Sequence, residues 1–483
     1  MRSSFFLAMA AALYCGTAAM GQTDLERFER QLEQIQRDTR LLVDPDLPAE
    51  ARSLIEYGGY VTFGFAAIDD TTQRTHILRQ LDLVGYVRVN LDGVHEFFLR
   101  GRMTYRDFDR GDSFDGNGDD LVEPTLDRGH YRFDLRRYMS AYEGQVVPYN
   151  VAFQGGRQLV HWANGLVLSQ EIDGAVIDLE YEPVSLQILA GVSRDSTTDF
   201  DSSRPNFDEE THRGFYGAML SVDVTAKHRP YIYGLVQVDN NKDDILTFGP
   251  TTTRFQYDSY YIGIGSRGSI TDNLVYGVEL VYQGGSTLSS SFTVAGTTAT
   301  AVAQTEDNIS AAAADFQLDY LFNDPNNSRV GLEVIFATGD TDRLHTSNTF
   351  GGNAPGTTDH AFNAFGLINA GLAFSPTISN IIIIRVGGST FPLPTTDFFQ
   401  RFQIGVNLYG FFKFDNNGPI DETTNTDSFL GFESDIYVNW QITSDVSLAI
   451  RYGIFFPGSA IHNAGANDDN PRHFFYTGLT FSF

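Results

Sequence analysis

The stretch RQLDLVGYVRVN, residues 79–90, alternates between apolar and polar side chains. The odd positions carry Leu81, Leu83, Gly85, Val87 and Val89. The even positions, apart from Val84, carry Gln80, Asp82, Tyr86, Arg88 and Asn90. Successive side chains of a β-strand point to opposite faces, so this stretch predicts a strand with one apolar face and one wet face.

The same alternation recurs to the end of the chain. It is clear in residues 401–414, RFQIGVNLYGFFKF, and in residues 429–441, FLGFESDIYVNWQ. Short turns at 91–93, 182–183 and 443–445 alternate with long polar loops. A soluble β-sandwich usually has shorter strands and short loops at both ends. The pattern therefore predicts a transmembrane β-barrel whose apolar face contacts lipid.

Both ends of the chain favour an outer-membrane location. The first residues, MRSSFFLAMAAALYCGTAAMGQ, have the charged start, apolar run and small residues of a signal peptide, with cleavage expected after Gly21. The last residues, RHFFYTGLTFSF, alternate and end on Phe483. This ending resembles the sorting signal that the assembly machinery of bacterial outer membranes reads. We therefore expect a Gram-negative type of outer membrane, with its lipid and that assembly machinery as partners.

Cysteine usage limits the chemistry of the mature protein. Cys15 is the only cysteine, and it lies within the predicted signal peptide. Cleavage would leave a chain without thiols. Disulfides and thiolate metal sites are thereby excluded.

The chain divides into three predicted parts, although 483 residues alone would allow two or three folded domains. Residues 1–21 form the signal peptide, and residues 22–56 form a periplasmic segment. In that segment Leu25, Phe28, Leu32 and Ile35 recur at helical spacing, which predicts a short amphipathic helix over residues 24–43. Residues 57–483 form the barrel.

Strand parity sets the number of strands. The alternation gives 19 candidate strands, but single-chain bacterial barrels have an even number because both termini lie on the periplasmic side. Tracing the turns from both ends agrees only if residues 360–374, HAFNAFGLINAGLAF, belong to the preceding long loop. The predicted fold is all-β: a transmembrane antiparallel barrel of about 18 strands with a short N-terminal periplasmic helix.

Four stretches of the barrel carry a family resemblance. They are GRQLVHWANGLVL (156–168), the expected strand RFDLRRYMSAY (132–142), FATGDTDR followed by NTFGG (336–352), and residues 429–460. Taken in their order along the chain, they resemble the alginate-export outer-membrane porins, and more distantly the substrate-specific porins. The resemblance implies an 18-stranded barrel with an arginine-lined pore that passes an anionic polysaccharide such as an alginate-like polyuronate.

Arginine is concentrated on one parity of residues 95–108, at Arg100, Arg102 and Arg106. An arginine on the lipid face at mid-membrane costs roughly 2–4 kcal/mol, so these side chains are expected to face the lumen. The same argument applies to neighbouring strands. The predicted pore-lining, substrate-binding set is Arg88, Arg100, Arg102, Arg106, Arg132, Arg136 and Arg157. Guanidinium groups suit carboxylate or phosphate binding.

A structural role for these arginines stays open at this point. They would then neutralise lumenal acids such as Asp82, Glu96 and Asp134 and stiffen the wall. Arg137 breaks the alternation and is left unassigned.

Acidic residues give the chain a formal net charge of -28, and they cluster in loops expected outside the cell. These loops are residues 107–123, 195–210, 240–244 and 463–470. We expect solvated loops that keep barrels apart. The DGNGDD run within the first loop suggests Ca²⁺ binding as a weaker alternative, because the closing glutamate of an EF-hand is missing.

No catalytic constellation stands out in the sequence. GIGSRG at 263–268 matches a dinucleotide fingerprint, but it lies within an alternating strand, where glycines relieve crowding. Histidines are scattered, so no catalytic residue, metal ligand or nucleic-acid site is assigned and the protein is not expected to be an enzyme.

Several functions remain open. The leading hypothesis is a channel for diffusion or export of anionic oligo- or polysaccharides. A general or cation-preferring porin is the alternative, because an acid-rich mouth concentrates cations. A barrel enzyme or an adhesin is a third. The sequence sets neither the oligomeric state nor the role of the N-terminal helix.

Overall fold

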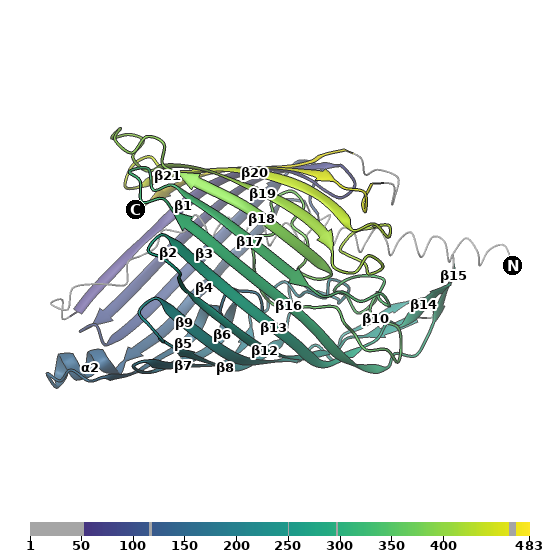
Figure 1. The fold of residues 1–483 in the computed structure, drawn as a ribbon, viewed down its shortest axis with the longest axis horizontal. Coiled ribbons are helices and arrows are strands. Elements are labelled where there is room, and N and C mark those ends of the chain that lie inside the picture. Colours follow the sequence, from purple (N-terminus) through teal and green to yellow (C-terminus); the bar gives the residue numbers. More distant parts are fainter. Residues whose placement is uncertain (1–52, 115–117, 250, 296–297, 463–469) are drawn as a thin grey trace.

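The computed structural model describes residues 53–483 apart from 115–117, 250, 296–297 and 463–469 (Figure 1). The predicted signal peptide and the helix expected over residues 24–43 lie outside the described residues. In the described part, no helix has the length and apolar character needed to cross a membrane.

Eighteen strands form one sheet. They are β1 (Ser53–Asp69), β2 (Thr75–Leu91), β3 (His95–Phe108), β4 (Asp120–Asp134), β5 (Tyr149–His161), β6 (Ser169–Tyr181), β7 (Val184–Ser193), β8 (Arg213–Val222), β9 (His228–Asp239), β12 (Tyr257–Ser269), β13 (Leu274–Leu288), β16 (Glu306–Leu321), β17 (Arg329–Ala337), β18 (Ile381–Thr390), β19 (Phe402–Lys413), β20 (Phe429–Gln441), β21 (Val446–Pro457) and β22 (Arg472–Ser482).

Each of these strands pairs antiparallel with the next, and β22 returns to pair with β1. The closed all-β barrel and its 18 strands confirm the predicted fold class. Residues 360–374 form no strand, as the parity argument requires. The wall begins earlier than expected, because β1 already includes Ser53.

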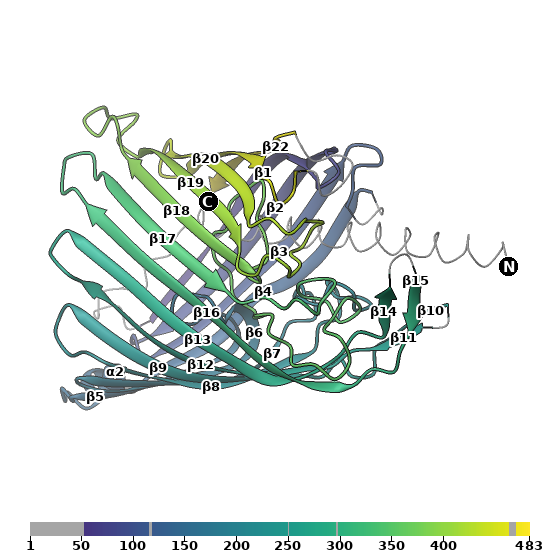
Figure 2. The same ribbon diagram turned by 45° about the vertical axis from the view of Figure 1, so that its right-hand side comes forward.

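The two ends of the barrel differ. At one end most of the strands are joined by short turns, and the chain terminus at Phe483 lies there (Figure 1). Asp92 and Gly93 both have positive φ, 54° and 70°, which suits the tight turn between β2 and β3. At the other end two hairpins project beyond the wall: β10 (Ile245–Phe248) with β11 (Thr251–Arg254), and β14 (Phe292–Ala295) with β15 (Thr298–Ala301) (Figure 2).

The two faces of the wall follow the predicted alternation. Leu83 and Leu99 are 41% and 57% exposed on the outer face, whereas Asp82 is 7% exposed on the inner face. Inward side chains are buried because other parts of the chain fill much of the lumen. The apolar core therefore lies inside the barrel, where Ile335 and Ile383 of the wall belong to the same buried cluster as Phe374 of a connecting segment.

The strand expected over residues 132–142 is wrong in its second half. Strand β4 ends at Asp134, and Leu135–Tyr142 form the helix α2. The Asp134 side chain accepts a hydrogen bond from the Arg137 amide at 2.9 Å, so it caps the helix and ends the strand. Arg137 is thus an exposed helical residue, and its guanidinium donates to the Gly93 carbonyl at 3.4 Å.

The direction of the barrel can be tested by surface labelling. We expect Asp243→Cys, in a long connection, to react in intact cells with a maleimide on a bulky polyethylene glycol chain. Ser444→Cys, in a short turn at the opposite end, should react only after the outer membrane is permeabilised. Both parent residues are exposed, so accessibility within the protein does not limit either reaction. Labelling of Ser444→Cys in intact cells would reverse the assigned direction.

Candidate functional site: the lumen, its arginines and its plug

Three of the predicted arginines lie on the inner face of adjacent strands. Arg88 of β2 and Arg100 and Arg102 of β3 occupy even-numbered positions, whereas the exposed, outward-facing residues of these strands occupy odd-numbered positions. Each is partly or fully buried. The strand alternation that identified them also places them together, because neighbouring strands keep the same parity inward.

Acidic partners hold these arginines in place. Arg88 Nη2 lies 2.7 Å from Glu96 Oε2, and Arg102 Nη2 lies 2.8 Å from Asp82 Oδ1. Two of the acids considered as neutralising partners are therefore paired in this way. Such charge-assisted contacts fix the guanidinium planes, which orients their remaining N–H groups.

Arg100 has a partner that the sequence did not indicate. Its Nε donates to Asp127 Oδ2 at 2.6 Å. The register of β3 and β4 shifts between Arg100 and Gly101, where Arg100 lies opposite Arg128 and Gly101 lies opposite Leu126. This bulge leaves Asp127 as an extra residue that reaches Arg100. A bulge has no clear sequence signature, so alternation alone could not find this contact.

Arg106 and Arg132 follow the same parity. Arg106 lies on β3 opposite Gln80, and Arg132 lies on β4 opposite Glu96. No ion pair of Arg132 occurs among the described residues. Its binding role, like that of the other inward arginines, stays a prediction.

Arg136 does not lie on a wall strand. It belongs to helix α2, and its Nη2 lies 3.3 Å from Glu180 Oε2. The strand assumed for it ends at Asp134, which removes the alternation on which its lumenal placement depended.

Arg157 lies on the outer face. The register joins Leu99, Gly129, Arg157, Asp173 and Val192 in one row across five strands. Leu99 and Val192 are 57% and 44% exposed, and residues directly opposite one another share a face. The lumenal placement expected for Arg157 is therefore wrong. The cost of an outward arginine is offset because Arg157 Nη2 lies 2.7 Å from Asp173 Oδ2.

Side chains bridge a short gap in the wall next to Arg157, which we call the β4–β5 seam. Backbone pairing between β4 and β5 covers only residues 129–134 and 152–157. Beyond it, Arg157 Nη1 donates to the Leu126 carbonyl at 2.8 Å, and Arg194 Nη2 donates to Thr125 Oγ1 at 3.1 Å. Pro124 lies on this unpaired part of β4, where its missing N–H costs no ladder bond.

Two connecting segments fold into the lumen, and we call them the lumenal plug: residues 162–168 and 362–374. They contact each other, because the Leu367 amide donates to the Gly165 carbonyl at 2.9 Å, and the Phe365 carbonyl also accepts the amide of Ser169, the first residue of β6, at 2.8 Å. Trp162, Phe362 and Phe374 are at most 1% exposed.

Glu433 of β20 fastens the longer plug segment to the wall. Its carboxylate accepts three consecutive backbone amides, those of Leu372, Ala373 and Phe374, at 2.5–2.8 Å. Successive amides of this kind form an anion-binding nest. Gly371 precedes them with φ of 96°, and a Cβ there would lie 2.8 Å from the Glu433 carboxylate. Both constraints require glycine.

The shorter plug segment is fastened to the wall by acids on β13 and β16. The Asn164 amide donates to Glu279 Oε2 at 2.7 Å, and its side chain donates to Asp315 Oδ2 at 2.8 Å. Glu279 also accepts from the Tyr233 hydroxyl at 2.5 Å. Sequence reasoning missed these anchors, because an inward acid on an alternating strand looks the same whether it meets water or a folded loop.

The inner wall therefore has two sides of different composition. Arginines with acidic partners occupy β2 and β3. Carboxylates gather on β13, β16, β17 and β20, and all are at most 3% exposed: Glu279, Asp315, Glu333, Glu433 and Asp435. Arg385 Nη2 lies 2.8 Å from Glu333 Oε2 on that side.

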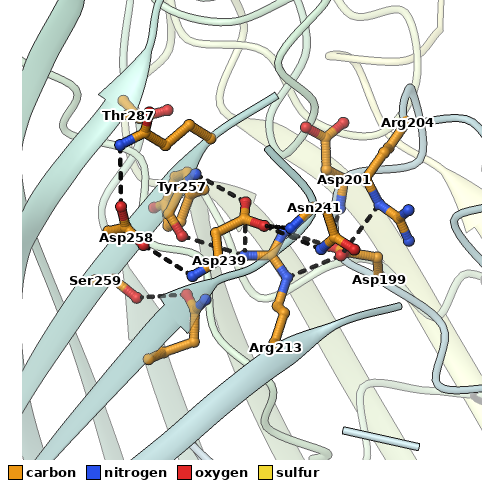
Figure 3. Close-up of polar contacts among 12 residues, drawn as sticks. Asp199, Asp201, Arg204, Arg213, Asp239, Asn241, Tyr257, Asp258, Ser259 and Thr287 are labelled. Carbon is orange, nitrogen blue, oxygen red and sulfur yellow. Dashed lines mark hydrogen bonds and ion pairs between the residues drawn. The ribbon is translucent and has the colours of Figure 1, made fainter. Parts of the chain in front are cut away.

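A buried ion cluster joins the loop of residues 195–210 to the ends of β8 and β9 (Figure 3). Arg213 Nε donates to Asp199 Oδ2 at 2.8 Å, and Arg213 Nη1 lies 3.3 Å from Asp239 Oδ2. The Arg213 guanidinium also lies over the Phe200 ring, 4.6 Å from its centroid. All three charged side chains are at most 1% exposed.

The loop of residues 195–210 also contacts the long connection between β17 and β18, which contains the longer plug segment. Asp201 Oδ2 accepts the Thr349 amide at 3.0 Å and its hydroxyl at 2.5 Å, and Asp201 Oδ1 accepts from Ser203. Burial raises the pKa of Asp201, and the hydrogen bonds from Ser203 and Thr349 oppose this rise. The expectation that residues 195–210 form a freely solvated loop is therefore wrong, since Asp199 and Asp201 are 0% and 2% exposed.

The remaining sequence hypotheses have separate outcomes. GIGSRG lies on β12, and a Cβ at Gly263 would meet the Tyr233 ring at 2.1 Å, so relief of crowding is confirmed. The described residues contain no group of three or more acids, histidines or cysteines suited to a metal ion. The Ca²⁺ hypothesis stays a prediction, because half of DGNGDD lies outside the described residues.

The comparisons with known proteins agree with this architecture. The family described as alginate export matches residues 64–475. The structure of Pseudomonas aeruginosa OccK5 (OpdH) is 8% identical and has a TM-score of 0.52, with 89% of this chain and 98% of that chain covered. Acinetobacter baumannii OccAB1 is 12% identical with a TM-score of 0.51, covering 89% and 96%. These identities show a shared fold alone.

The comparison with curated proteins gives no match. The family match, by contrast, covers most of the barrel, from β1 to β22. The chain therefore belongs to the alginate export family, and its closed barrel is an outer-membrane channel.

Proposed function

We propose that this channel passes anionic oligo- or polysaccharides, such as polyuronates, along the arginine side of its lumen. The observation that carries the proposal is the inward placement of Arg88, Arg100 and Arg102 on two adjacent strands. In this proposal the protein binds and releases its substrate without catalysis. A passive path needs weak, repeated sites, so that a polymer enters and also leaves.

The ion pairs are compatible with such a role. A guanidinium has five N–H donors, and a carboxylate partner occupies at most part of them. The Arg102 side chain is 24% exposed, compared with 6% for Arg88 and 11% for Arg100. Arg102 is therefore the arginine of the three that a passing carboxylate reaches most easily.

A general or cation-preferring channel is the second candidate. The five buried carboxylates on β13, β16, β17 and β20 favour it, as does the pairing of Arg88, Arg100 and Arg102 with acids. Arginines that are fully neutralised would stiffen the wall without attracting anions. The two candidates differ in ion selectivity and in block by oligouronates.

We expect Arg102→Gln to shift the reversal potential in a salt gradient toward cation selectivity. Block by an oligouronate should weaken about tenfold, because a charged hydrogen bond contributes about 1.5–3 kcal/mol. The double variant Asp82→Asn with Arg102→Gln is the matched control, since it removes the pair without changing the lumenal charge. Planar-bilayer recording measures both properties.

The double variant separates substrate binding by Arg102 from the effect of the net lumenal charge on ion selectivity. If Arg102 binds the substrate, the double variant keeps the reversal potential of the wild type but loses oligouronate block. If a folded Arg102→Gln channel keeps both its reversal potential and its block, the anionic-saccharide proposal fails and the general channel takes its place.

A further inference from the structure

A cavity of about 590 Å³ lies at the extracellular rim, outside the lumen. It is bounded by β13 and β16 and by loop residues 338–342, 357–358, 360 and 414–415. This volume falls within the range of small-ligand pockets, roughly 300–1,000 Å³. Neither the arginine side of the lumen nor the plug contributes to it.

The register shows that the cavity opens on the outer side of the wall. Tyr282 lines it and lies opposite Ile262 and Ala312. Ile262 is 52% exposed and Tyr282 is 44% exposed, so this row faces outward. A molecule in the cavity would therefore approach from the cell surface or from the outer leaflet, and not through the channel.

Hydrogen bonds hold the floor of the cavity in place. The Asp340 carboxylate accepts the Asp342 and His360 amides, each at 2.7 Å. The Thr338 hydroxyl donates to the His360 carbonyl at 2.7 Å, and His360 Nδ1 lies 2.8 Å from the Ser310 carbonyl oxygen. The last contact requires the proton on Nδ1, which leaves Nε2 of the neutral ring as an acceptor.

The lining combines negative charge with aromatic surface. Asp342 and Asp415 contribute carboxylates, the buried Asp340 adds a third negative charge, and none of the lining residues is lysine or arginine. Tyr282 and Phe414 are 44% and 47% exposed, so their rings are available for contact. Aromatic faces attract cations and cover the apolar faces of ligands. Threonine hydroxyls complete the lining at positions 338, 341, 357 and 358.

We propose that this cavity binds a saccharide that carries a free amine. The hydroxyl-rich ligand suits the threonines, and its ammonium group suits the carboxylates and the aromatic rings. The acidic lining, which contains neither lysine nor arginine, disfavours a uronate. The inference is thus independent of the channel's substrate, which carries the opposite charge.

The ligand has two possible sources with the same chemistry. One is a free amino-oligosaccharide, and the other is the headgroup of an outer-leaflet glycolipid that contains an amino sugar. Tyr260 and Tyr282 form an outward aromatic pair beside the cavity, with ring centroids 6.4 Å apart. Such rings gather at the membrane interface, which places the cavity near lipid headgroups.

The test is calorimetric titration of the full-length purified protein with three trisaccharides of matched size. These are the glucosamine trisaccharide, its N-acetylated form and a uronate trisaccharide. We expect the glucosamine form to bind at least about ten times more tightly than the N-acetylated form, with no binding of the uronate. Equal binding of the first two, or binding of the uronate at this cavity, would overturn the proposal.

Variants locate the binding. Asp342→Asn should weaken it up to about fivefold at low salt, and Tyr282→Ala about tenfold or more. Tyr260→Ala is the matched control, since it removes an outward ring beside the cavity that does not line it. Equal effects of Tyr260→Ala and Tyr282→Ala would contradict a specific site.

A second arm identifies the source. The protein is placed in nanodiscs with outer-leaflet glycolipid that either carries or lacks an amino sugar, and retention of each glycolipid is measured. Selective retention that Asp342→Asn abolishes supports the headgroup, even where the free trisaccharide does not bind. Failure of both the free trisaccharide and the glycolipid ends the proposal.

Discussion

Excision of residues 363–379 should raise single-channel conductance several-fold. These residues include most of the longer plug segment, and an 18-stranded barrel without such a segment leaves an aqueous channel. The ends of the excised loop already meet, because the Phe362 and Asn380 amides both donate to the Thr338 carbonyl at 3.1 Å. A short glycine linker between them therefore leaves the wall unstrained. Planar-bilayer recording measures the change.

Glu433→Gln is the matched control for this excision. It keeps the plug segment but weakens the nest of three amides on the Glu433 carboxylate. We expect a mean conductance near that of the wild type, with more frequent brief openings as the segment detaches. If the excised, folded barrel conducts like the wild type, the segment does not limit ion flow.

Asp199→Ala should lower the stability of the barrel mouth by about 3–5 kcal/mol, because breaking a buried pair leaves a buried charge uncompensated. Arg213 is 1% exposed and would keep only Asp239 as a close acidic partner. The loop of residues 195–210 should then separate from the wall. Its release is measured by limited proteolysis of the folded barrel and by the temperature at which the barrel unfolds in detergent.

An exposed ion pair provides the comparison. Lys227 and Asp272 form a contact with side chains 52% and 84% exposed. Surface pairs contribute about 0–1 kcal/mol, so Asp272→Ala should change the unfolding temperature little. If both variants behave alike, the Arg213 cluster does not stabilise the mouth.

The sequence predicted the strands of the wall well. One face of each membrane-spanning strand contacts lipid and must be apolar, so apolar and polar side chains alternate along it. Strand parity also placed residues 360–374 in a loop, although their apolar character resembles that of a strand. That character has another cause: Phe362 and Phe374 pack inside the lumen. Helix α2 was missed, because alternation continues through Leu135 and the capping role of Asp134 depends on backbone geometry.

The candidate site was predictable only in part. Arg100 and Arg102 follow from parity. The outward position of Arg157 could not be predicted from parity, because it depends on the pairing of Arg157 with Gly129 of β4. The acids that hold the plug could not be recognised, since contacts such as that between Asn164 and Asp315 join residues 151 positions apart. Such distances between partners leave no local pattern in the chain.

The β4–β5 seam affects how the circumference of the barrel can change. Elsewhere in the wall, neighbouring strands are held together by backbone hydrogen bonds, for which every amino acid except proline supplies both a donor and an acceptor. Beyond the six backbone-paired positions of β4 and β5, the contacts to β4 come from Arg157 of β5 and from Arg194, which follows β7, so a few substitutions can loosen this unpaired part of the wall. An additional hairpin inserted there would interrupt fewer peptide contacts than in a fully paired ladder. The seam is therefore a natural starting point for building a twenty-stranded descendant with a wider bore.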